Sequence, residues 1–290
     1  MNSCERQCDR NSISSREKFT LRSSTYKKFC KLKGLMLKKR IIPVLLLKNG
    51  RMVKGKNFQN FIDTGNPNTA VKIYTSQYAD ELMFIDITAN SETRKTLIEI
   101  ISNAAKDAFM PFTVGGGIKS EEDVRQILAN GADKVLITTE ALYNNSLITE
   151  SAKKFGSQAI ITGIDYKFDQ EKKNFFVWTH SGKKKTNLSP LELARVYQDL
   201  GAGEVMINNI DRDGLMRGYD LEISQQISSI LKVPLITCGG AGNFQHIVNL
   251  FSETEVSAAA CSSIFHFGDN CPMQARTYLR NHGIEMRNIK

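Results

Sequence analysis

The residue best suited to acid-base chemistry is Asp165, which ends the apolar run Ala159–Ile164. Such a run favours a buried strand, and its last residue then lies at the sheet edge where substrates bind in α/β proteins. A carboxylate there can act as a general acid or base if burial or a nearby charge tunes its pKa. The alternative is a hydrogen-bonded loop carboxylate without a catalytic role.

Two glycine clusters, each followed one unit later by a hydroxyl pair, predict phosphate sites. One cluster would be weak support because turns use glycine widely. Backbone N–H groups at such turns and helix starts bind phosphate together with hydroxyls, so two equivalent clusters favour a ligand with two phosphates. The first set is Gly115-Gly116-Gly117 with Thr138-Thr139, and the second is Asp213-Gly214 and Gly239-Gly240 with Ser262-Ser263.

The first apolar run ends in Leu45-Leu46-Leu47 and offers no titratable group comparable to Asp165. Lys54, a little further on, could contact a phosphate, although such a lysine is usually solvated. Cys238 could be imagined as a nucleophile beside its glycines. A buried small residue is the better interpretation, because the sequence shows no activating base.

These candidate residues lie in a chain that repeats itself. Two pairs of segments are 123 residues apart, and a third pair lies within one residue of that separation. Each half has the same order of apolar strand, glycine cluster, helix, apolar strand and hydroxyl pair, which indicates a duplicated structural unit. The pairs are Asp80–Asp86 with Gly203–Asn209, Pro111–Gly117 with Pro234–Gly240, and Lys134–Thr139 with Ala258–Ser263.

Eight apolar runs predict buried parallel strands, and helical periodicity between them predicts the helices that cover such a sheet. Eight strand-helix units in two similar halves favour the α/β class and a closed (β/α)8 TIM barrel with internal half-barrel duplication, rather than an open sheet. The runs are Ile41–Leu47, Leu82–Ile87, Phe112–Val114, Lys134–Thr138, Ala159–Asp165, Glu204–Asn209, Pro234–Cys238 and Ser257–Cys261.

The net charge of +9 belongs to the start of the 290-residue chain. Residues 1–40 hold 12 Lys and Arg against 3 Asp and Glu, which leaves 27 against 27 in the rest. We therefore expect a basic, disordered extension over residues 1–38, or a start codon at Met36, and a barrel over 39–290. A targeting role for the extension is the sharper alternative. The balanced body argues against nucleic acid as a partner, and the absence of a long apolar run argues against a membrane.

Charged residues of alternating sign stand at or near the starts of four predicted strands. They could form a ring of salt bridges at the mouth opposite Asp165, which in an ordinary barrel is a stability device. These residues are Arg40, Glu81, Lys134 and Glu204.

Cysteine and histidine spacing predicts neither a metal site nor a cofactor. None of the six cysteines forms a two-residue zinc or redox pair, so free thiols in a reducing cytoplasm are expected. Only His180, before Ser181-Gly182-Lys183, lies in a predicted mouth loop, and a solvated histidine is the simpler interpretation. The cysteines are Cys4, Cys8, Cys30, Cys238, Cys261 and Cys271.

From about Met36 onward the chain resembles the cyclase subunit of imidazole glycerol phosphate synthase, a (β/α) barrel of histidine biosynthesis. That family receives ammonia from a glutaminase, its heterodimer partner, docked on the amino-terminal face, and uses it to convert a bis-phosphorylated ribonucleotide. The resemblance lies in RIIPVLLLKNGRMVKG, DELMFIDITAN, PFTVGGGI, GADKVLITTEAL, FGSQAIITGIDYK, HSGKKKTN, GAGEVMINNIDRDGLMRGYD, CGGAG and SSIFHF.

The resemblance implies roles for the candidate residues. Asp165 would be the acid-base residue and Lys54 a substrate contact, with Asp213 beside the second phosphate site. Asp133 would dock the glutaminase. Gly117, Thr138 and Thr139 would bind one phosphate, and Gly214, Gly240 and Ser263 the other. Arg40, Glu81, Lys134 and Glu204 would form the ammonia gate.

Two departures from the family pattern fall on the chemical mouth. Leu46 stands where the family has its first catalytic aspartate, and leucine can neither carry a proton nor accept a hydrogen bond. Ile62 stands where the family usually has an arginine near the substrate. We therefore expect a paralogue that supplies ammonia, through a third protein, for sugar amidation in surface-polysaccharide synthesis. The alternatives are an authentic synthase cyclase and a non-catalytic activator of the glutaminase.

Overall fold

The computed structural model describes residues 38–88 and 91–287, and eight parallel strands within them close into a barrel. Each barrel strand pairs with the next, and β12 pairs with β1 to complete the ring, so the barrel itself has no open edge. This confirms the predicted (β/α)8 barrel. The strands are β1 (Arg40–Lys48), β4 (Leu82–Asp86), β5 (Phe112–Gly115), β6 (Lys134–Ile137), β7 (Ile160–Asp169), β10 (Glu204–Asn209), β11 (Leu235–Cys238) and β12 (Ala258–Cys261).

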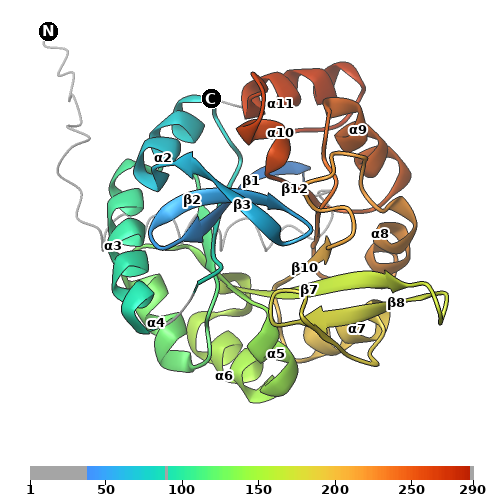
Figure 1. The fold of residues 1–290 in the computed structure, drawn as a ribbon, viewed down its shortest axis with the longest axis horizontal. Coiled ribbons are helices and arrows are strands. Elements are labelled where there is room, and N and C mark those ends of the chain that lie inside the picture. Colours follow the sequence, from blue (N-terminus) through green and yellow to red (C-terminus); the bar gives the residue numbers. More distant parts are fainter. Residues whose placement is uncertain (1–37, 89–90, 288–290) are drawn as a thin grey trace, which may run out of the picture. The chain divides into compact units, whose positions relative to one another are not determined.

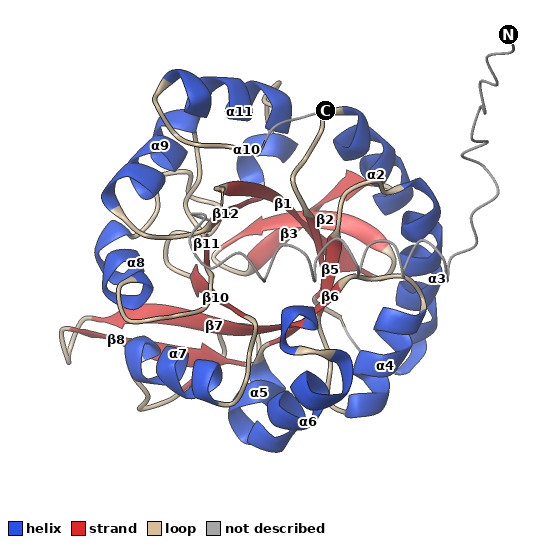
Figure 2. Cartoon of the chain, turned by 180° about the vertical axis from the view of Figure 1, so that it is seen from behind, coloured by secondary structure: helices blue, strands red, loops and turns tan. Residues whose placement is uncertain are grey.

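Helices follow the barrel strands and surround them in both views (Figures 1 and 2). Helix α4 begins at a capping box in which Ser120 and Asp123 satisfy each other's backbone N–H groups. The helices are α2 (Pro67–Ser76), α3 (Ser91–Asp107), α4 (Glu121–Ala129), α5 (Thr139–Tyr143), α6 (Asn145–Phe155), α7 (Pro190–Asp199), α8 (Leu221–Ser228), α9 (Phe244–Glu253), α10 (Ser263–His266) and α11 (Pro272–Asn281).

Two apolar clusters pack on the two faces of the barrel sheet. Along β1, Ile42 and Val44 belong to the inner cluster while Ile41 and Leu45 belong to the cluster beneath the helices. Successive side chains of a strand point to opposite faces, so both sets are buried. This double burial explains why the strands read as unbroken apolar runs rather than as alternating patterns.

The half-barrel duplication is visible in the strand register. In the first half Leu82 pairs with Phe112, and in the second half Val205 pairs with Leu235. Both members of the second pair lie 123 residues after those of the first, which is the separation found in the sequence.

Each half also carries a hairpin that the sequence analysis did not predict. Strands β2 (Arg51–Lys56) and β3 (Gln59–Gly65) follow β1, whereas β8 (Asn174–Thr179) and β9 (Lys184–Lys185) follow β7. The prediction that the fifth apolar run ends as a strand at Asp165 is wrong. The strand continues to Asp169 because β8 pairs with it in antiparallel fashion. The β2–β3 hairpin lies across the centre of the ring (Figure 1).

Among the described residues no helix is long and apolar enough to cross a membrane. The expectations for residues 1–37, including the start at Met36 and the three cysteines there, lie outside the described part of the chain.

Candidate active site

Asp165 lies on β7 with the same strand parity as Ile161, whose side chain belongs to the inner cluster, so its carboxylate faces the barrel interior. The amide of Asn208 donates a hydrogen bond of 3.1 Å to Asp165 Oδ1. Burial raises the pKa of Asp165 to about 7, the Asn208 hydrogen bond opposes this rise, and the charge of Asp213 adds to it. Such a group can take up or release a proton near neutral pH, as a general acid or base must.

A cavity of about 10 Å³, roughly the space of one water molecule, lies beside Asp165. Its lining includes Thr138, Thr139 and Trp178. The structure therefore brings the carboxylate together with the hydroxyl pair of the first glycine-hydroxyl set. The backbone N–H of His180 donates to Thr139 Oγ1 at 3.2 Å, so the exposed β8–β9 turn is tied to the same place.

The first glycine cluster has a backbone that only glycine fits. Gly116 has a φ of +102°, and a Cβ there would lie 2.0 Å from the carbonyl oxygen of Asp86. Gly117 also has a positive φ, of +60°. The end of β5 therefore packs directly on the end of β4.

The second glycine set joins three loops at the same mouth. Gly240 has a φ of +115°, and the backbone N–H of Gly218 donates to its carbonyl at 2.8 Å. At Gly214 an added Cβ would lie 2.5 Å from the carbonyl oxygen of Gly55 on β2. Ser263, at the start of α10, is buried. The loop after β10 is thus held between the end of β11 and the β2–β3 hairpin.

Lys54 is buried at this mouth and paired with Asp213. Its Nζ lies 2.8 Å from Asp213 Oδ1, and the side chain is 1% exposed. The alternative of a solvated lysine is therefore wrong. A buried ammonium must be paired because its desolvation is otherwise uncompensated, so the pair fixes both side chains next to the second glycine set.

Leu46 is the half-barrel counterpart of Asp165. The antiparallel pairing of β1 with β2 begins at Leu46 opposite Val53, and that of β7 with β8 begins at Asp165 opposite Trp178. Leu46 packs against the inner cluster, so it faces the interior as Asp165 does. Ile62 lies opposite Lys54 in the β2–β3 pairing, with 64% of its surface exposed.

Two further side chains near this mouth had no clear signal in the sequence. Nε2 of His266 lies 3.2 Å from the carbonyl oxygen of Val44, which is on the strand that carries Leu46. Burial lowers the pKa of His266, the Val44 contact opposes this, and the charge of Lys54 lowers it further. Asn208 is the other, since an amide between Ile207 and Asn209 at the end of an apolar run gave no reason to expect a partner for Asp165.

Cys238 does not behave as a nucleophile in this structure. Burial raises the pKa of its thiol far above the ordinary value, so the reactive thiolate is absent at neutral pH. Residues 38–88 and 91–287 contain no group of three or more His, Cys, Asp or Glu side chains that could hold a metal.

At the opposite mouth Arg40, Glu81, Lys134 and Glu204 form a closed ring of four ion pairs. Arg40 Nη1 lies 2.6 Å from Glu81 Oε1, and Arg40 Nη2 lies 2.6 Å from Glu204 Oε2. Lys134 Nζ lies 3.1 Å from Glu81 Oε2 and 2.5 Å from Glu204 Oε1. Burial alone would raise the pKa values of both glutamates, but the charges of Arg40 and Lys134 outweigh it and lower that of Glu204 to about 2. Both glutamates are therefore ionised at neutral pH.

Asp133 precedes Lys134 on the same side of the barrel. Its Oδ2 accepts a 3.0 Å hydrogen bond from the backbone N–H of Phe112, and the side chain is only partly buried. This leaves it at the surface of the face that the ring opens onto.

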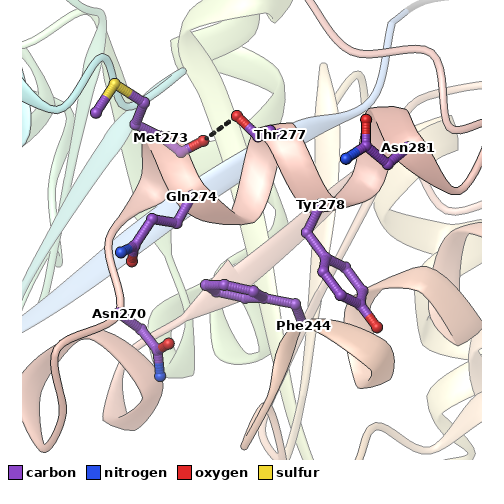
Figure 3. Close-up of a pocket in the computed structure, with 7 residues that line it drawn as sticks. All are labelled: Phe244, Asn270, Met273, Gln274, Thr277, Tyr278 and Asn281. Atoms are coloured by element: carbon purple, nitrogen blue, oxygen red, sulfur yellow. Dashed lines mark hydrogen bonds between the residues drawn. The ribbon is translucent and has the colours of Figure 1, made fainter.

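A groove of about 550 Å³ lies elsewhere, on the outside of the barrel between α9 and α11 (Figure 3). Its lining contains no carboxylate and no cationic side chain, and it lies away from the strand ends. It therefore offers no acid-base chemistry. The lining residues are Phe244, Asn270, Met273, Gln274, Thr277, Tyr278 and Asn281.

Fold and site together define a (β/α)8 barrel with a tuned carboxylate and two glycine-hydroxyl sets at one mouth and an ion-pair ring at the other. The chain belongs to the histidine biosynthesis protein family, whose model matches residues 40–270. It is 46% identical over 252 residues to the imidazole glycerol phosphate synthase subunit HisF of Chlorobium phaeobacteroides (strain BS1), covering 87% of this chain and 100% of that protein. The subunit HisF of Staphylococcus carnosus (strain TM300) is 41% identical over 252 residues, with 87% and 99% coverage.

Proposed function

We propose that this chain receives ammonia from a glutaminase at the ion-pair ring and delivers it to an acceptor at the opposite mouth, without performing the histidine-pathway cyclisation itself. The observation that carries the proposal is Leu46, an apolar side chain at the place that corresponds to Asp165 in the other half of the barrel. An acid-base pair needs two titratable groups, and loss of one typically costs about 10²-fold or more in rate.

The interior of the barrel supports passage of ammonia. Between the two mouths the inner cluster is built of apolar side chains, with Ile42, Met83, Leu136 and Met206 among them. Neutral ammonia loses far less hydration free energy on entering such surroundings than the ammonium ion does. The charged ring at one end and the apolar interior behind it therefore favour the neutral molecule.

We infer the partner and the class of ligand from the relatives and from the residues of the two mouths. The relatives are named as subunits of a synthase, which supports a heterodimer in which Asp133 and the ring face a glutaminase. The glycine-hydroxyl sets, Lys54 and Asp213 retain the features of a mouth for a phosphorylated ligand. We further propose that the final acceptor is a nucleotide-linked sugar held by a third protein.

The test is a steady-state assay of the purified chain with the bis-phosphorylated aminoimidazole carboxamide ribonucleotide and an ammonium salt. We expect no turnover from the wild-type chain and a gain of turnover in Leu46→Asp. The matched control is Leu46→Asn, which is polar and similar in size but carries no transferable proton. Adding Ile62→Arg to Leu46→Asp should lower the KM by restoring a phosphate-binding fork. Turnover by the wild-type chain would overturn the proposal.

An authentic synthase cyclase is the second candidate, favoured by the names of the relatives and their full-length match. Asp165, with its pKa near 7, would then work without the first carboxylate. Wild-type turnover that Asp165→Asn abolishes would establish this candidate.

A further inference from the structure

A buried ion pair between Asp80 and Arg276 lies directly behind the ion-pair ring. Arg276 Nη2 is 2.7 Å from Asp80 Oδ1, and both side chains are almost fully buried. Asp80 immediately precedes Glu81, and its second oxygen, Oδ2, accepts a 3.0 Å hydrogen bond from the backbone N–H of Ile41. Ile41 immediately follows Arg40, so one carboxylate touches the backbone next to two members of the ring.

Arg276, on α11, is held in place on the side away from the ring. Its guanidinium donates to the carbonyl oxygen of Tyr78 at 2.7 Å and to that of Arg287 at 2.8 Å. Burial raises the pKa of Asp80, and the charge of Arg276 and the Ile41 amide oppose that rise. Asp80 therefore depends on Arg276 to remain a carboxylate that can accept both hydrogen bonds.

We propose that Asp80 is a positioning residue for the Arg40–Glu81 side of the ring, and that Arg276 holds it there. The Asp80 carboxylate binds the backbone of β1 next to Arg40, and Asp80 itself precedes Glu81 in the chain. This contact therefore holds Arg40 Nη1 and Glu81 Oε1 at their separation of 2.6 Å. The inference rests on the proposed function only in giving the ring a role in ammonia passage.

The experiment is an NMR titration of the glutamate side-chain carboxyls in the full chain, comparing the wild type with Asp80→Asn. Asn keeps the shape and one acceptor oxygen but loses the charge that pairs with Arg276. If the ring stayed in place, removing a nearby negative charge would lower the pKa of Glu81 further, because like charges disfavour ionisation. If the ring depends on Asp80, the carboxyls lose their cations while burial still disfavours ionisation, so their pKa values rise.

The direction of the pKa change in Glu81 therefore distinguishes a positioning role of Asp80 from the mere loss of its charge. We expect the titration midpoints of Glu81 and Glu204 to lie higher in Asp80→Asn than in the wild type, where the charges of Arg40 and Lys134 lower both. The matched control is Asp63→Asn, which removes an exposed carboxylate paired with Arg51 on the β2–β3 hairpin and should leave both midpoints unchanged.

Unchanged or lowered midpoints in a folded Asp80→Asn chain would overturn the proposal. If that variant does not fold, Arg276→Lys, which keeps the charge but not the forked contacts, is titrated in its place with the same expectation. The readout does not use the acceptor, so turnover of the wild-type chain as a synthase would end the proposed function and leave this inference standing.

Discussion

Leu46 and Asp165 occupy matching places in the two halves of the barrel, each as the first residue at which a barrel strand pairs with its own hairpin. One half thus presents a carboxylate with a pKa near neutrality, and the other presents an aliphatic side chain. Because both side chains face the interior, the acid-base chemistry at these two matching places depends on the carboxylate of Asp165 alone.

The raised pKa of Asp165 predicts that its replacement stabilises the protein at higher pH. The folded state disfavours the ionised form, so the wild type loses stability as pH rises from the ordinary pKa of 3.8 to about 7. Asp165→Asn avoids this loss. Its free energy of unfolding should exceed that of the wild type by about 1 to 2 kcal/mol at high pH, after allowing for partial solvent contact. Urea unfolding at about pH 4 and pH 8 measures the difference, which should be small at the lower pH.

Lys54 and Asp213 should couple strongly in stability. Lys54→Met leaves the buried carboxylate unpaired, and we expect a loss of about 3 kcal/mol or more in the free energy of unfolding. Adding Asp213→Asn removes the orphaned charge and should recover part of the loss. A double-mutant cycle from urea unfolding measures the coupling, and additive single effects would contradict the pairing.

Glu204→Gln should destabilise the protein at neutral pH and progressively less in acid. The wild-type carboxylate has a pKa lowered to about 2, so its contribution is present above the ordinary value of 4.5 and is lost as pH falls toward 2. The variant leaves Lys134 and Arg40 with one fewer partner, at a cost of about 2 to 4 kcal/mol near pH 7. The measurement is urea unfolding from about pH 7 to pH 3. A difference that does not shrink below pH 4.5 would contradict the role of the charge.

Gly240→Ala should lower the free energy of unfolding far more than Gly283→Ala does, although both glycines have positive φ. A Cβ at Gly240 would lie 2.1 Å from the carbonyl oxygen of Gly218, whereas nothing lies within 4 Å of one at Gly283. We expect Gly283→Ala to lower the free energy of unfolding by about 1 kcal/mol through backbone strain, and Gly240→Ala to lower it several times more. Thermal unfolding of the two variants gives the comparison, and equal losses would mean that the loop after β10 can move away.

Local pattern in the sequence determined the barrel and much of the site. Eight apolar runs, buried on both faces, had to be strands, and the repeat at 123 residues predicted two matching halves with identical register. The same repeat placed the glycine-hydroxyl sets at one mouth. The apolar run Ala159–Ile164 predicted Asp165 as the candidate acid-base residue, because strand direction decides which residues end at the mouth.

Contacts between distant segments decided the rest. The hairpins depend on pairing with a barrel strand. β2 and β3 are rich in polar residues and gave no strand signal, whereas the aromatic run in β8 favours a strand but becomes one here by pairing with β7. The burial of Lys54 depends on Asp213, which lies 159 residues away. The same holds for the Asn208 contact with Asp165 and for the link from Arg276 to Asp80, 196 residues apart. The pKa of a carboxyl depends on burial and neighbouring charge, and both arise only when the chain has closed on itself.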